Sequence, residues 1–154
     1  MAHLSILLSG GPGNADPRKS LGGAMSTNPI NGKTLFGTPS KDELRTGSIT
    51  YRVIYVKNPT NVTGKNLVAY FTANMFGVYS MGVLQPANEY VPQITNGLTA
   101  PQGVKFSMPN RGATGVSIGE LAPAGYRALY LCREMPEDSF VEMLNWQIEV
   151  AELV

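Results

Sequence analysis

The sequence predicts an all-β protein, an immunoglobulin-like or related antiparallel β-sandwich with an irregular N-terminal arm. Apolar residues alternate in short runs from residue 48 onward, and turn residues, including many of the 17 Gly and 11 Pro, separate these runs. A hydrophobic fraction of 43% is enough for one buried core. We therefore divide the chain into an N-terminal strand with its arm, residues 1–46, and a β-sandwich, residues 47–154.

The N-terminal region begins with an apolar strand at residues 4–8 and continues with a Gly-, Pro-, Asn- and Ser-rich segment at residues 10–45. That segment lacks apolar periodicity, so we expect no helix or long strand in it. An irregular stretch of this length is typical of an arm or a functional loop. Its anchors would rest on its own sandwich or on a neighbouring subunit, and we expect some of them to contact another chain. The five candidates are Leu21, Met25, Ile30, Leu35 and Phe36.

The first strands of the sandwich follow from alternation and turn residues. Residues 48–57 form a strand that places four apolar side chains on one face, namely Ile49, Tyr51, Val53 and Tyr55. This strand ends at Asn58-Pro59, because proline has no N–H to continue the ladder. Residues 67–74 and 78–84 form the next two strands, and the polar, proline-containing residues 85–102 form a loop.

The remaining strands are expected at residues 104–108, around 116–118 and at 126–133. The turn before Tyr126 has the spacing of a tyrosine corner, in which the tyrosine hydroxyl bonds back across the turn. Residues 139–145 fit either a helix or a strand, and we favour a final strand from about Asn145. The side chains expected in the core are Tyr51, Val53, Phe106, Tyr126, Tyr130 and Trp146.

The charge composition argues against nucleic acid and membrane partners. Twelve Lys and Arg against eleven Asp and Glu give a net charge of +1, which is no electrostatic footprint for a polyanion. Only 15% of residues are charged, where about 25% is usual. No apolar run is long enough for a membrane span. The low charge therefore indicates that part of the surface faces other proteins.

The residues of common catalytic and metal sites are scarce. A single cysteine, Cys132, excludes a disulfide framework within the chain and any multi-Cys zinc site. A single histidine, His3, makes a histidine-based triad or a multi-His metal site improbable. One acidic cluster lacks the spacing of a calcium loop, so we interpret it as a solvated loop. Its members are Glu134, Glu137, Asp138 and Glu142. We assign no catalytic, cofactor-binding or metal-binding residue and expect no enzyme.

Two short motifs resemble catalytic signatures and fail on their context. Residues 115–119 match the G-x-S-x-G nucleophile elbow, which requires a following helix and a histidine base. Residues 120–123 are a turn, so Ser117 is interpreted as the outward residue of a strand. Gly32-Lys33-Thr34 resembles the end of a phosphate-binding loop, but Thr27 stands where its first glycine would be. We therefore expect neither hydrolase activity nor nucleotide binding.

Four stretches together carry a resemblance to a known group of proteins. They are LSGGPGNADPRKSLGGAMS, YRVIYVKNP, APQGVKFSMP and ATGVSIGELAPAGYRALYLCREMP. With these stretches, which cover most of the chain, the sequence resembles small accessory structural proteins of tailed bacteriophage virions. The resemblance lies in structural motifs and includes no catalytic signature. It implies a component of the virus particle, located in the virion and assembled in the host cytoplasm.

The expected function is that of a non-enzymatic virion structural protein, a head decoration or cement protein that stabilises the capsid through repeated contacts. Its expected partners are the major capsid protein or other virion proteins, together with further copies of itself in the particle. A neck, collar or tail component of the same fold is the first alternative. A carbohydrate-binding or host-adhesion module is the second, since clustered aromatic side chains can stack on sugars.

Overall fold

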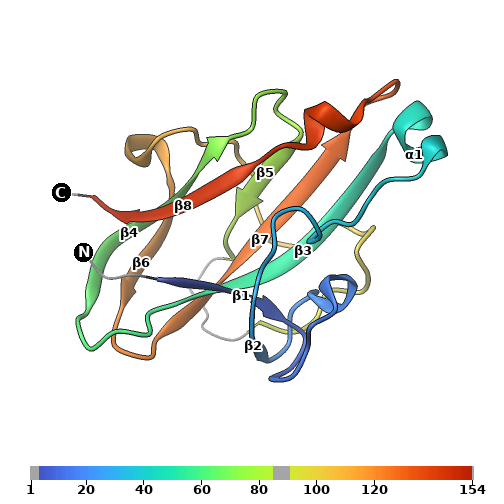
Figure 1. Cartoon of the computed structure of the whole chain (residues 1–154). Helices are drawn as coiled ribbons and strands as arrows, with labels where there is room; N and C mark the ends of the chain where they lie inside the picture. The colour runs from blue at the N-terminus through green and yellow to red at the C-terminus, as the bar shows by residue number, and fades with distance from the viewer. Residues whose placement is uncertain (1–3, 85–90, 154) are drawn as a thin grey trace.

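The computed structural model of the protein describes residues 4–84 and 91–153 (Figure 1). Two antiparallel sheets face each other, so the predicted all-β sandwich is confirmed. The strands are β1 (Ser5–Ser9), β2 (Met25–Pro29), β3 (Ser48–Lys57), β4 (Gly64–Ala73), β5 (Tyr79–Gly82), β6 (Val116–Leu121), β7 (Tyr126–Met135) and β8 (Gln147–Glu152). The helical turns are η1 (Pro17–Lys19), α1 (Lys41–Thr46), η2 (Gly112–Thr114) and η3 (Val141–Leu144).

The two sheets differ in size, and from β3 onward successive strands alternate between them. The larger sheet has the order β2-β1-β3-β7-β5, and the smaller has the order β6-β4-β8. From β4 to β8, each strand lies in the other sheet from the strand that precedes it in the chain. In the described part of the chain, therefore, no two consecutive strands from β3 to β8 pair as a hairpin. No described helix is long and apolar enough to cross a membrane.

Strand β3 is the centre of the larger sheet and is buried on both of its faces. It pairs with β7 over its whole length, from Ser48 opposite Met135 to Lys57 opposite Tyr126, and with β1 on its other side. Its even-numbered residues face the smaller sheet and its odd-numbered residues face the other way. The sequence predicted one apolar face for this strand, whereas a strand that is covered on both sides reads as a nearly continuous apolar run.

The main core fills the space between the two sheets. Its buried side chains come from six of the strands, from the residues that flank β5 and from the segment before α1, so the N-terminal region contributes directly to it. Burial of this apolar surface is the dominant stabilising term of such a sandwich. The buried members are Leu8, Leu35, Phe36, Ile54, Val56, Leu67, Ala69, Phe71, Val78, Tyr79, Met81, Val83, Ile118, Leu121, Leu129 and Leu131.

A second apolar cluster lies on the outer face of the larger sheet. Val53, Tyr55, Ala128 and Tyr130 project from β3 and β7, and Val91 covers them from the irregular segment that follows residue 90. The Tyr55 hydroxyl donates a hydrogen bond to the Gly23 carbonyl and accepts one from the Val91 N–H at 3.2 Å. The protein is thus a two-sheet sandwich with a third layer of irregular chain.

The strand predicted at residues 104–108 is absent from the structure, which has two isolated bridges there, Leu84 to Val104 and Met81 to Ser107. The irregular chain passes so close to β5 that a Cβ on Gly82 would lie 2.5 Å from the Lys105 carbonyl oxygen. Pro101 and Pro109 lie on either side of this stretch and, having no N–H, cannot extend its pairing in either direction.

The expectation of no helix at residues 10–45 is corrected by α1, whereas the expectation of no long strand holds, since the strand formed there is short. The five-residue strand β2 pairs with β1, and α1 begins at residue 41. A capping box starts this helix, because the Ser40 hydroxyl accepts from the Glu43 N–H and the Glu43 carboxylate accepts from the Ser40 N–H. Hydrogen bonds of the buried Ser9 and Ser20 hydroxyls to the Val53 carbonyl, at 2.6 and 2.7 Å, join the segment to β3.

The turn between β6 and β7 is held by Asn58 and not by a tyrosine corner. Among the described residues, Tyr126 makes no hydrogen bond across this turn and packs edge-on against Tyr55 at 5.5 Å. The buried Asn58 amide donates to the Leu121 and Val62 carbonyls at 3.0 and 2.7 Å. Its backbone N–H and carbonyl bond to the residues 124–125 of the same turn. One asparagine therefore ties two loops together.

The predicted core residues divide into two groups. Val53 and Tyr130 are buried, as expected. The other four are half-buried: Phe106 and Tyr126 pack at the margin of the second cluster, Trp146 packs at the margin of the main core, and Tyr51 packs against the Phe106 ring at 5.7 Å. At the C-terminal end, residues 141–144 form the single turn η3 and the final strand begins at Gln147, which confirms the favoured strand to within two residues.

Candidate protein-interaction surface

Six large apolar side chains lie exposed at one end of the sandwich, and we call them the end patch. They come from four separate parts of the chain: the start of β3, the β4–β5 loop, the irregular segment before η2 and the link between β7 and β8. They are Ile49, Met75, Phe76, Met108, Phe140 and Val141, with exposed fractions from 41% for Ile49 to 89% for Met75. Single exposed apolar residues are ordinary, whereas a contiguous group is typical of an interaction site.

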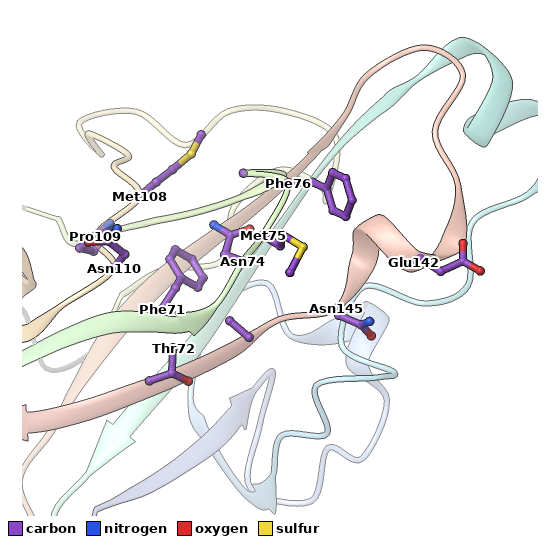
Figure 2. A pocket seen from close by; sticks show the side chains of 12 residues that line it. Phe71, Thr72, Asn74, Met75, Phe76, Met108, Pro109, Asn110, Glu142 and Asn145 are labelled. Atoms are coloured by element: carbon purple, nitrogen blue, oxygen red, sulfur yellow. The ribbon is translucent and has the colours of Figure 1, made fainter.

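Contacts across the patch show that its members are neighbours. The rings of Phe76 and Phe140 meet edge to face, with their centroids 5.4 Å apart. Phe76 also borders two adjoining hollows, one of 840 Å³ that it shares with Met75 and Met108 and one of 620 Å³ that it shares with Ile49 (Figure 2 shows the first). The patch is therefore one continuous surface with Phe76 near its centre.

The β4–β5 loop turns its apolar side chains outward because Asn74 closes it from within. The Asn74 amide donates to the Tyr79 carbonyl at 2.8 Å, and its oxygen accepts from the Tyr79 N–H at 3.2 Å. Gly77 follows with a φ of +65°, a conformation that glycine adopts without strain. Since these bonds use the inner side of the loop, Met75 and Phe76 stand on its outer side (Figure 2).

The patch has an acidic border. Glu142 lines the first hollow, and Glu134 and Glu137 line the second. All three side chains are exposed, and the described residues that line the two hollows include no Lys or Arg. An apolar centre with a charged border is the usual anatomy of a protein–protein interface. The sign of the border favours a partner that carries Lys or Arg around an apolar contact.

The five arm residues proposed from the sequence pack on the chain's own sandwich and lie outside the end patch. Leu35 and Phe36 are buried in the main core. Met25 and Ile30 are half-buried against the second cluster and the main core, and the half-buried Leu21 forms a bridge with Val53. The structure therefore distributes these residues along the sandwich and does not gather them at a shared exposed site.

Sequence reasoning missed the end patch, although local signals were present. Two large apolar residues, Met75 and Phe76, fall between Asn74 and Gly77, where a turn normally carries polar side chains. Phe140 and Val141 likewise stand within an acidic loop. Each pair alone is unremarkable on a surface, and only the fold brings the two pairs together.

The residues of the rejected motifs occupy structural positions. Ser117 is exposed as the second residue of β6, which continues as a strand to Leu121, so the strand-turn-helix of a nucleophile elbow does not form. His3 lies outside the described residues. Within the described part of the chain, no three His, Cys, Asp or Glu residues are grouped as metal ligands. The Tyr79 ring stacks on one face of the Trp146 indole, with centroids 5.1 Å apart, and the indole N–H donates to the Gly32 carbonyl.

Comparison of the chain with protein-family models, with curated proteins and with solved structures gave no match. The features that bear on its function are the end patch and the groups around it. Its apolar side chains can remove surface from water on binding, which is the main driving force of protein association. The arrangement is therefore chemically suited to packing against another protein.

Proposed function

We propose that the protein is a non-enzymatic structural component of a tailed-phage virion, a head decoration or cement protein that packs against the major capsid protein through its end patch. The observation that carries the proposal is the continuous exposed apolar surface centred on Phe76. The sequence resemblance to accessory virion proteins supplies the class of partner. The low fraction of charged residues supports the same reading.

The end patch suits a protein that binds at many equivalent positions of a particle. The Asn74 side chain bonds across the β4–β5 loop and residues 141–144 form the turn η3, and such local structure lowers the ordering cost of docking. A modest contact, repeated at every equivalent position of a symmetric shell, sums to a large stabilisation of the particle. Basic side chains around the contact on the capsid protein would face the acidic border and speed association.

The test is incorporation of purified variants onto particles that lack the native protein. Phe76→Ser and Phe140→Ser remove the central ring pair, and we expect each to weaken binding by at least about 2 kcal/mol, the usual size for a central aromatic contact. Val62→Ser and Leu98→Ser are the matched controls, since these side chains are exposed by 61% and 74% and lie outside the patch. They should bind as the unmodified protein does.

Thermal melts of the free proteins accompany the binding assay. All four replaced side chains are exposed, so the variants should melt close to the unmodified protein. Incorporation of Phe76→Ser at the unmodified level would refute the proposal that the patch is the contact. Failure of the unmodified protein to join particles at all would refute the virion role. Copy number then separates head decoration, with hundreds of copies, from a neck or tail position, with a few to a few dozen.

A further inference from the structure

Two buried arginines, Arg52 on β3 and Arg133 on β7, hold the segment at residues 35–37 against the larger sheet. The Arg52 Nε donates to the Leu35 carbonyl at 3.0 Å, and Arg133 Nη1 donates to the Gly37 carbonyl at 3.0 Å. Both guanidinium groups also lie near the Phe36 ring, at 5.8 and 5.4 Å from its centroid. Their positive charges therefore share one small region of the molecule.

These charges have no carboxylate partner among the described residues, whose two ion pairs are Arg18 with Asp16 and Arg45 with Asp42. Arg133 is only 3% exposed, and its Nε has no hydrogen-bond acceptor. Backbone carbonyls and a ring face compensate a buried cation only in part, and an unpaired buried charge is costly. Burial and the nearby Arg133 charge both lower the pKa of Arg52, consistent with an excess of positive charge here.

A cavity of about 230 Å³ adjoins Arg133. Lys33, which is exposed, borders it, and Phe36, Val141 and Leu144 supply apolar walls. The described lining residues include no Asp or Glu. The cavity thus combines two cationic groups with an apolar lining, and it has room for a small organic group.

We propose that this cavity binds a carboxylate carried on a short apolar stem, with Arg133 and Lys33 holding the carboxylate and Phe36 and Leu144 contacting the stem. Arg133 lines the cavity with a guanidinium charge that has no carboxylate partner within the described part of the chain, and a carboxylate supplies the opposite charge that this wall lacks. The carboxylate can belong to a small organic acid or to a glutamate side chain of a partner protein. Val141 belongs to the end patch and also borders this cavity, but the proposal does not require the virion role.

The test follows the side-chain Nε–Hε resonance of Arg133 by NMR while a probe is added to the full chain. Butyrate should shift it saturably, with a dissociation constant on the order of 1–10 mM, and n-butylammonium, the charge-reversed control, should not. The peptide Ac-Gly-Glu-Gly-NH2, compared with its glutamine counterpart, represents a protein side chain. A shift with butyrate alone identifies a small-acid site, and a shift with the glutamate peptide identifies a site that accepts a protein side chain.

Lys33→Ala should weaken the binding by about two- to fivefold, the usual effect of one exposed charge. The matched control is Lys65→Ala, because Lys65 is also an exposed lysine and lies on β4 outside the cavity, and it should leave the binding unchanged. Both replaced side chains are exposed, so both variants should fold. The proposal is wrong if no carboxylate probe gives a saturable shift up to its solubility limit, or if n-butylammonium shifts the resonance equally.

Discussion

Replacing Leu35 by alanine should strongly destabilise the protein, because this side chain is fully buried in the main core. Three fewer buried carbons, at ~0.8 kcal/mol each, lose about 2.4 kcal/mol of transfer free energy. A residual cavity of about 50 Å³, at ~24 cal/mol per Å³, adds about 1.2 kcal/mol. The Leu35 carbonyl keeps its bond from Arg52 in the variant, so the loss measures the side chain alone.

The assay is chemical denaturation of the variant and the unmodified protein, with Leu98→Ala as the control. A total loss of about 3.5 kcal/mol corresponds to a fall of roughly 7–14 °C in melting temperature for a chain of this size. Leu98 is 74% exposed, so its replacement should change the free energy of unfolding by less than about 0.5 kcal/mol. If Leu35→Ala unfolds as late as the control, the segment before α1 is an arm outside the core and our placement of it is wrong.

Three further predictions follow from other positions. Asn58→Asp places a carboxylate next to the two carbonyl oxygens that accept hydrogen bonds from the Asn58 amide. Chemical denaturation should therefore show a free energy of unfolding lower by about 3 kcal/mol or more at neutral pH, and a smaller loss in acid, where the carboxyl is protonated. An unchanged free energy of unfolding would contradict the role of Asn58 in joining the two loops. Ser117→Ala should leave the melt and particle incorporation unchanged, because the side chain is exposed on a strand; ester hydrolysis lost in this variant would reveal an enzyme. Cys132 is only 7% exposed, and burial raises the pKa of its thiol. A disulfide reagent at pH 8 should therefore modify the thiol only as fast as the protein unfolds. Rapid modification of the native protein would show that the thiol is accessible.

The central strands could be predicted from the sequence because their signals are local. Alternation and turn residues located both ends of β3 correctly and β7 to within two residues. The partners of a strand are not local, and so the second buried face of β3 was missed. What covers that face is a distant irregular segment, which includes Val91 and has no periodicity that would reveal its contact.

The candidate site was less predictable than the fold. Leu35 and Phe36 stand among Gly, Pro and Asn residues, where composition suggests exposure, yet two buried arginines bond to the carbonyls around them. The end patch depends on loops from different connections meeting at one end of the sandwich. Such a meeting is a property of topology, and single-sequence patterns carry little information about it.

The alternation of successive strands between the sheets has a consequence for synthesis of the chain. During translation β3 emerges long before its main partner β7, and β4 long before β8, so the larger sheet cannot be completed before β7 has left the ribosome, nor the smaller sheet before β8 has. Pairings so distant in sequence make folding slow, and the exposed apolar strands need protection meanwhile. Phe140 lies in that same final part, between β7 and β8. A prematurely terminated product would therefore lack both its fold and half of the ring pair at the centre of the end patch.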